Sequence, residues 1–255
     1  MPVNLSRKTA APPTEHFYTG IHARMAQAAH PRPTLREFTE ALDRHSLVSG
    51  GKALDAGCGG TAGFSAPMAA HGASVVALDV NLPILRNARA ANAGAAGLLF
   101  CAGSAMAMPF RDATFDFVVA SGVVHHAQDP EVALRELARV TRQSGVLYVS
   151  IYCFAGSLFE WIVRAWRVIG SAVPFSWMHR LLGWNRAINS FVLDHMYVPT
   201  LWLFRADEAR RMLERSGFSI RVEWASAMDP FARWGRPGSW ISGSGLLRVW
   251  LCEKR

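Results

Sequence analysis

The chain has 255 residues, 51% of them hydrophobic, which suffices for a substantial core and excludes an intrinsically disordered protein. No stretch approaches the roughly 18 uninterrupted apolar residues of a membrane span, and the first residues lack the apolar segment of a signal peptide. The four cysteines have no paired spacing, so we expect reduced thiols, a cytoplasmic protein and no metal site. The net charge of +8 comes mostly from scattered arginines in the second half, which favours a solvated basic face over a nucleic-acid surface.

The N-terminal part is expected to form a tail and two helices. Residues 1–14 are polar and contain proline, which predicts a mobile tail. A helix-compatible segment covers residues 15–30, and Pro31 and Pro33 end it. A second helix follows, and Thr34 is in a position to cap it.

Residues 52–60 are the most informative stretch, because a short apolar run there enters a turn with three glycines. A helix over residues 62–70 and a second apolar run ending at Asp79 complete a β-turn-α-β unit, with a nucleotide-type site at the first turn. Glycines allow the backbone to reverse and to bring its N–H groups against a ligand. Asp79 stands where a carboxylate would accept both ribose hydroxyls. Asp55 would repel a diphosphate and attract a cation, which argues against a dinucleotide.

The middle of the chain continues the alternation of helices and strands. The pattern predicts a helix over residues 81–93, strands over 98–102, 114–120 and 146–151, and a helix that starts at Pro130 with Asp129 as its cap and Gly145 past its end. Ligands of open α/β sheets lie beyond the carboxyl ends of the strands. The residues after the fourth strand, Ser121 to His126, are therefore expected at the site.

The segment Leu-Asp-Ala-Gly-Cys-Gly, residues 54–59, resembles the first motif of class I methyltransferases that depend on S-adenosylmethionine (SAM). The block 118–150, with His125-His126 and Asp129-Pro130, is similar to the quinone-methylating, small-molecule branch of that family. The resemblance implies an α/β, Rossmann-like fold: a seven-stranded, mostly parallel sheet with a terminal antiparallel hairpin, N-terminal helices, and a helical lid inserted after the fifth strand.

The same resemblance implies SAM as cofactor, S-adenosylhomocysteine as product, and a set of binding residues. These are Asp55, Gly57, Cys58, Gly59, Asp79, Val80, Ser104, Ala105, Met106 and Ser121. Ser104 stands where the family usually has an aspartate that accepts the adenine amino group, and a neutral hydroxyl is a weaker acceptor. His126 is the candidate general base by its position, and Tyr18 or His195 would orient or assist it.

Four regions follow from this organisation: residues 1–50 as N-terminal tail and helical lid, 51–152 as cofactor-binding core, 153–204 as an aromatic-rich substrate cap, and 205–255 as the last helix and terminal strands. Residues 157–172 of the cap form a predicted helix with one narrow polar stripe, Glu160, Arg164, Arg167 and Ser171. Its other faces are apolar, so it should be covered on several sides. Three alternatives for what covers this helix remain open: the core together with an apolar substrate, a second subunit, or a lipid surface.

The leading functional hypothesis is methyl transfer from SAM to a small, apolar or aromatic acceptor, with O- or N-methylation favoured over C-methylation. A SAM-binding protein that transfers no methyl group is the alternative, and a nucleic-acid methyltransferase is a weaker one. An NAD-linked oxidoreductase is disfavoured by Asp55. A homodimer is compatible with the cap's aromatic content.

Overall fold

The computed structural model describes residues 2–6, 32–48, 50–173, 175–182, 193–226 and 246–255. The helix expected over residues 15–30, and with it Tyr18, lies outside these described residues. The polypeptide between the predicted terminal strands lies outside them as well.

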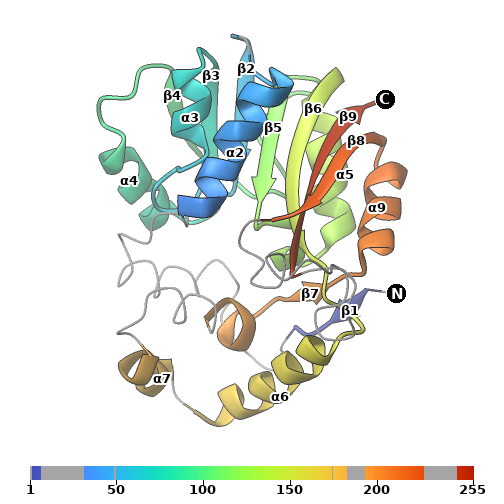
Figure 1. Ribbon diagram of the computed structural model, residues 1–255. Coiled ribbons are helices and arrows are strands. Elements are labelled where there is room, and N and C mark those ends of the chain that lie inside the picture. Colours follow the sequence, from blue (N-terminus) through green and yellow to red (C-terminus); the bar gives the residue numbers. More distant parts are fainter. Residues whose placement is uncertain (1, 7–31, 49, 174, 183–192, 227–245) are drawn as a thin grey trace.

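One seven-stranded sheet forms the centre of the protein, with the strand order β4-β3-β2-β5-β6-β9-β8 (Figure 1). Five strands are parallel, whereas β9 runs antiparallel to both β6 and β8. The predicted mostly parallel sheet with a terminal antiparallel hairpin is thus confirmed. The strands are β2 (Lys52–Ala56), β3 (Ser74–Asp79), β4 (Leu98–Ala102), β5 (Phe115–Ser121), β6 (Thr141–Tyr152), β8 (Phe218–Ala225) and β9 (Leu247–Lys254).

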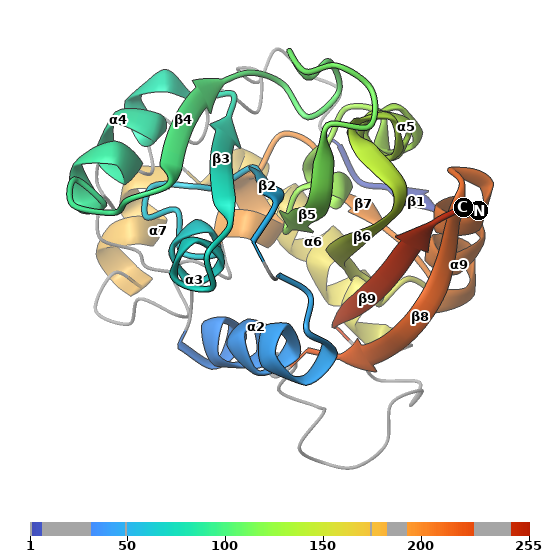
Figure 2. The same cartoon turned by 90° about the horizontal axis from the view of Figure 1, so that it is seen from above.

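Helices cover both faces of the sheet (Figure 2). On one face, α2 (Arg32–His45) and α3 (Ser65–Ala70) bury Phe38, Phe64 and Met68 against β5 and β6. On the other face, α5 (Pro130–Val140) and α9 (Ala206–Arg215) bury leucines and Met212. Helix α4 (Leu82–Ala91) packs beside β3 and β4. Burial on both faces explains the nearly continuous apolar runs of the parallel strands.

Local capping chemistry sets the start of one helix as predicted. The Asp129 carboxylate accepts the N–H groups of Glu131 and Val132 at 2.9 and 3.1 Å, which fixes the start of α5. Asn81 caps α4 in the same way. The prediction that Thr34 caps α2 is wrong, because α2 begins two residues earlier at Arg32. The first turn of a helix tolerates a proline such as Pro33, because the N–H groups of that turn have no partner within the helix. Gly145 does not end α5 either, since the helix stops at Val140 and β6 starts at once.

A helical insertion follows β6, the fifth strand of the parallel part, where the sequence predicts it. It contains α6 (Leu158–Ala172), α7 (Phe175–Leu182), the π-helix η2 (Leu193–Tyr197) and β7 (Trp202–Leu203). Strand β1 (Val3–Asn4) pairs antiparallel with β7, and Leu5 N donates to Leu201 O at 2.8 Å. The predicted mobile tail is therefore wrong for residues 2–6. None of the helices in the described part of the chain is long and apolar enough to cross a bilayer.

The orientation of α6 is opposite to the usual one for a surface helix. Two residues of its polar stripe face the protein together with Val163, since Glu160 is 5% exposed and Arg167 is 8% exposed, whereas the Arg164 side chain is 40% exposed. The Arg167 guanidinium donates to the carbonyls of His195 and Val198, both at 2.9 Å, and so holds η2 and the following loop. The expectation that this helix is covered on several sides is wrong, because Trp161 is 66% exposed and Val168 is 72% exposed.

Candidate active site

The glycine turn follows β2 and is hydrogen-bonded to the carboxyl end of β3. Gly57 has φ +79°, a conformation that favours glycine, and its N–H together with that of Cys58 donates to Leu78 O at 2.8 and 2.9 Å. Gly59 N donates to Asp79 Oδ2 at 3.1 Å. The expectation that these N–H groups face a ligand is wrong for all three, since strand β3 and its terminal carboxylate accept them.

The Asp79 carboxylate lies where the turn meets the start of α4. Its Oδ1 accepts the Asn81 N–H at 2.9 Å, and burial raises the pKa of its carboxyl. The carboxylate also accepts the Val80 N–H, and since it offers about four lone-pair sites, a further hydrogen bond from a ligand is chemically possible. Val80 follows with 41% exposure, an apolar surface beside the acid.

Asp55 lies beneath the turn with only 1% of its surface exposed. Ser65, the first residue of α3, donates its hydroxyl to Asp55 Oδ2 at 2.6 Å. Burial, opposed by this hydrogen bond and assisted by the charge of Asp79, raises the pKa of Asp55 to about 7. Ser65 has no role in the sequence-based site, because no spacing rule connects it to Asp55.

The Cys58 side chain points into the core, where it packs with Ala62, Ala77 and Ala88. Burial raises the pKa of its thiol, so it is a neutral apolar group at the turn. Any contact of Cys58 with a ligand is therefore restricted to its backbone.

A pH-dependent stability follows from Asp55. Its pKa in the folded protein, about 7, exceeds the ordinary value of 3.8, so folding favours the protonated carboxyl and stability is lost as the pH rises towards and through 7. Asp55→Asn should remove this loss, so its free energy of unfolding relative to wild type should rise by about 2–3 kcal/mol between pH 5 and pH 8. Urea denaturation at both pH values measures the difference. Parallel curves for both proteins would show that Asp55 is ionised at pH 5.

The loop after β4 approaches the same edge of the sheet. Gly103 N donates to Asp79 O at 3.1 Å, and Ser104 Oγ accepts the Met106 N–H at 3.2 Å. Ala105 packs against the core, and Met106 is half-buried. The Ser104 hydroxyl oxygen accepts this backbone hydrogen bond through one lone pair, so the hydroxyl hydrogen can still be donated to another acceptor.

Ser121, at the end of β5, is held by a residue outside the predicted site. Its hydroxyl forms a hydrogen bond with Ser150 Oγ at 3.0 Å, and Gly122 N donates to the same oxygen at 3.0 Å. Ser150 thus couples the ends of β5 and β6. The expected cofactor residues gather at one edge of the sheet because parallel strands all end there.

His126 ends the 3-10 helix η1 (Val124–His126), just beyond β5. Its Nδ1 lies 3.0 Å from the carbonyl oxygen of Thr200, which only accepts, so Nδ1 carries the hydrogen and Nε2 is the ring nitrogen without one. Burial lowers the pKa of His126 to about 4, the bond to Thr200 opposes this shift, and the charge of Arg167 adds to it. The imidazole is therefore neutral above about pH 5.

Tyr152, the last residue of β6, connects the histidines. Its ring centroid lies 3.9 Å from that of His125 and 4.7 Å from that of His195, and His125 lies 4.4 Å from His126. Burial lowers the pKa of His125 well below its usual range, and Nδ1 of His125 accepts the Tyr152 N–H at 3.3 Å. The position of Tyr152 at the carboxyl end of a core strand is the signal that could have identified it from the sequence.

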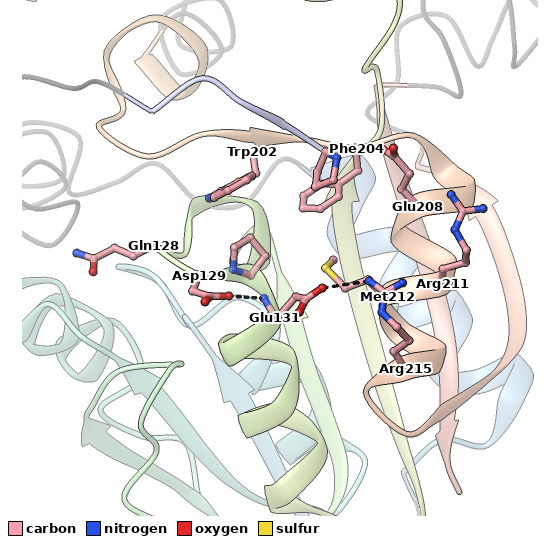
Figure 3. A pocket seen from close by; sticks show the side chains of 11 residues that line it. Gln128, Asp129, Glu131, Trp202, Phe204, Glu208, Arg211, Met212 and Arg215 are labelled. Carbon is pink, nitrogen blue, oxygen red and sulfur yellow. Dashed lines mark hydrogen bonds and ion pairs between the residues drawn. The ribbon is translucent and has the colours of Figure 1, made fainter.

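A hollow of about 550 Å³ lies elsewhere, between the start of α5, strand β7 and helix α9 (Figure 3). Trp202, Phe204 and Met212 form its apolar wall, and Glu131 pairs with Arg215 at 3.0 Å beside them. None of its lining residues comes from the glycine turn or from the ends of β3 and β4. No cluster of three possible metal ligands occurs within the described ranges.

Comparison with known proteins identifies the family of this chain. A family model described as "Methyltransferase domain" matches residues 54–149. A protein of Encephalitozoon cuniculi, named provisionally as a methyltransferase, is 31% identical over 167 residues, which cover 64% of this chain and 69% of that protein. The chain belongs to the SAM-dependent methyltransferase family.

Other methyltransferases match over shorter shares of their length. A malonyl-[acyl-carrier protein] O-methyltransferase of Erwinia pyrifoliae is 36% identical over 142 residues, 55% of this chain and 52% of that enzyme. A demethylmenaquinone methyltransferase of a Parafrankia strain is 34% identical over 170 residues, 60% of this chain and 63% of that enzyme. The matched part of the methyltransferase thus spans about half to two thirds of these relatives.

A solved structure supports the fold over nearly the whole chain. The Burkholderia thailandensis 1,6-didemethyltoxoflavin-N1-methyltransferase, with bound 1,6-didemethyltoxoflavin and S-adenosylhomocysteine, superposes with a TM-score of 0.65 at 13% identity. The alignment covers 99% of this methyltransferase and 94% of that chain. SAM is the cofactor of the family, and the predicted cofactor is confirmed at that level.

Proposed function

We propose that this protein transfers the methyl group of SAM to the oxygen or nitrogen of a small, apolar or aromatic acceptor. The observation that carries the proposal is the tautomer of His126, whose Nδ1–H is held by Thr200, so that Nε2 is the ring nitrogen without a hydrogen. A phenol or a protonated amine must lose a proton when it attacks a methyl group, and a positioned imidazole accelerates that step. Methylation at carbon would depend less on a proton acceptor at this position.

The charge of the glycine-turn region fits SAM better than a diphosphate. Asp55 and Asp79 lie close enough for the charge of Asp79 to raise the pKa of Asp55, so a further anion would be repelled and a cation would be stabilised. SAM supplies an electrophilic methyl group on a sulfonium and also carries an ammonium. We propose that Asp79 accepts ribose hydroxyls, and that Gly57, Gly59, Val80 and the Ser104–Met106 turn contact the rest of the nucleoside.

The properties of His126 restrict the acceptor. A pKa of about 4 keeps Nε2 unprotonated throughout the physiological range, but it also makes the imidazole a weak base. Such a base suits an acidic O–H, such as that of a phenol, better than an aliphatic alcohol. We therefore favour a phenolic or enolic oxygen within the proposed acceptor class.

A cluster of aromatic rings near His126 supports an aromatic acceptor. Tyr152, Phe154, Phe159 and His195 form a connected ring cluster with centroid distances between 4.7 and 6.4 Å. We propose that residues 153–204 act as the substrate cap and that His195 orients the acceptor through this cluster. Tyr18 is retained as a second assisting candidate within the N-terminal region, 1–50.

Product analysis tests the proposal. Purified protein is incubated with SAM and a panel of phenols, hydroquinones, amines and enolic acceptors, and S-adenosylhomocysteine is measured by mass spectrometry. We expect stoichiometric S-adenosylhomocysteine and methylated acceptor with one of the phenolic or enolic compounds. SAM binding without S-adenosylhomocysteine for any compound would favour the alternative of a SAM-binding protein that transfers no methyl group.

Asp79→Ala should weaken SAM binding about 10- to 100-fold, which corresponds to ~1.5–3 kcal/mol for the loss of a charged acceptor. Calorimetric titration with SAM measures this change. Asp43→Ala is the matched control, because Asp43 is an exposed carboxylate that pairs with His71 on the far side of α3. Equal dissociation constants for the two variants would remove Asp79 from the cofactor site.

A further inference from the structure

Exposed apolar side chains are concentrated on two helices of the insertion. Ten large hydrophobic residues in the described part of the chain are exposed, and six of them lie on α6 and α7. We call these six the α6–α7 patch: Leu158, Trp161, Val168, Ile169, Trp177 and Leu181. Two of them are tryptophans that are 66% and 73% exposed, and clustering of this kind marks an interaction surface.

The outward orientation of the patch is fixed by contacts on the opposite side of α6. Leu158, Trp161 and Val168 follow one another at spacings that place them on one side of α6. On the opposite side, the Arg167 guanidinium is bonded to main-chain carbonyls, and buried Glu160 accepts the Gly156 N–H and pairs with Arg164. Rotating α6 to bury the patch would break these charged contacts, so the apolar side is held outward.

The charge around the patch is positive. Residues 155–193 contain four arginines and a single acidic residue, Glu160, and among the described residues Arg164, which pairs with Glu160, and the exposed Arg180 border the patch, whereas Arg167 is buried. Glu160 is buried, so it is not available to an outside partner. Arg180 is exposed on α7, next to Leu181, and the Arg164 guanidinium lies 5.6 Å from the centre of the Trp161 ring. Tryptophan and leucine bordered by arginine are typical of helices that lie in a lipid headgroup region.

We propose that the α6–α7 patch docks on the surface of an anionic lipid bilayer. Helix α6 has 15 residues and a length of about 22 Å, shorter than the ~30 Å hydrocarbon core, so it would lie in the interface plane. A second copy of this chain is a poorer occupant, because a two-fold contact would bring the arginines of one patch against those of the other, and Glu160, the one acidic residue in the sequences of α6 and α7, is buried.

The position of the patch suits this role. Figure 1 shows α6 and α7 along the lower edge of the molecule, and in Figure 2 both helices lie behind the sheet. They are on the side of the sheet towards which the parallel strands run, the side that carries the histidines. The inference goes beyond the proposed function, since lipid binding needs neither cofactor nor methyl transfer.

Vesicle flotation of the full chain tests the proposal with two lipid compositions, pure phosphatidylcholine and an equal mixture of phosphatidylcholine and phosphatidylglycerol. We expect flotation with the anionic vesicles and at least 10-fold weaker partitioning to the neutral ones. The double variant Trp161→Ser/Trp177→Ser should lower partitioning by roughly 100-fold, from the usual transfer free energy of two large apolar side chains. Leu99→Ser is the matched control, because Leu99 is 63% exposed on β4, and it should float like wild type.

Charge reversal and oligomeric state complete the experiment. Arg180→Glu should lower partitioning to the anionic vesicles by about 10- to 30-fold, since each basic residue near such a surface contributes ~1 kcal/mol. The same flotation for the double variant and wild type would overturn the proposal, as would equal binding to neutral and anionic vesicles. Light scattering without lipid provides a separate test: a wild-type dimer that the double variant converts to a monomer would assign the patch to a second copy.

Discussion

His126→Ala is expected to lower kcat by about 10²–10⁴ while the dissociation constant of SAM stays within twofold of wild type. The hydrogen bond from Nδ1 to the Thr200 carbonyl holds the ring with Nε2 as the acceptor, so the substitution removes a positioned base and leaves the glycine turn untouched. Single-turnover methyl transfer and calorimetric titration with SAM measure the two quantities separately. The rate should recover partly between pH 7 and pH 10 for a phenolic acceptor, because the phenolate then forms without the imidazole.

Two further variants make this result specific. His126→Gln keeps a hydrogen-bonding side chain but has no group that accepts a proton near neutral pH, so it should be as slow as the alanine variant. His71→Ala, which removes a histidine on the α3 side of the protein, should be as fast as wild type. If His126→Ala lost SAM affinity and rate by the same factor, His126 would be a structural residue of η1, and the base would have to be sought at His195 or Tyr18.

Gly57→Val should destabilise the folded protein by ~2–5 kcal/mol and abolish measurable SAM binding. Gly57 has φ +79°, where a β-branched residue is strained by ~1–2 kcal/mol. A Cβ at this position would also overlap the side chain of Val123, which approaches the turn from the loop after β5. The collision adds the cost of overpacking, typically ~1–3 kcal/mol. Urea denaturation and SAM titration measure the two effects.

Gly217→Val is the control that separates strain from collision. Gly217 has φ +93° but nothing within 4 Å of a Cβ placed on it, so its variant should lose only the strain energy. Combining Gly57→Val with Val123→Ala should restore part of the lost stability by removing the overlapping methyl groups. Equal free energies of unfolding for Gly57→Val and Gly217→Val would show that the approach of Val123 contributes nothing.

The sequence by itself determined the order of the core elements, and it predicts that the candidate site residues meet at one edge of the sheet. Capping by Asp129 and the turn at Gly57 are local features, so spacing along the chain is sufficient to predict them. Carboxyl ends of parallel strands meet at one edge whatever the details of packing. Asp79 and the Ser104 loop could therefore be assigned to one site before their hydrogen bonds were known.

Only the tertiary structure decided the contacts between segments that are distant in sequence. The hydroxyl of Ser65 on Asp55 and the carbonyl of Thr200 on His126 have no pattern along the chain that could predict them. The pairing of β1 with β7, 198 to 200 residues away, is of the same kind.

The direction in which α6 faces is the clearest case of a decision made by tertiary structure. Its sequence shows a polar stripe and an apolar remainder, and hydrophobicity alone would turn the stripe to water. The main-chain carbonyls around His195 and Val198 need donors in a buried place, and Arg167 supplies them. Satisfying those buried acceptors outweighs covering the apolar face, because unmet hydrogen bonds in the interior cost more than apolar side chains left at the surface.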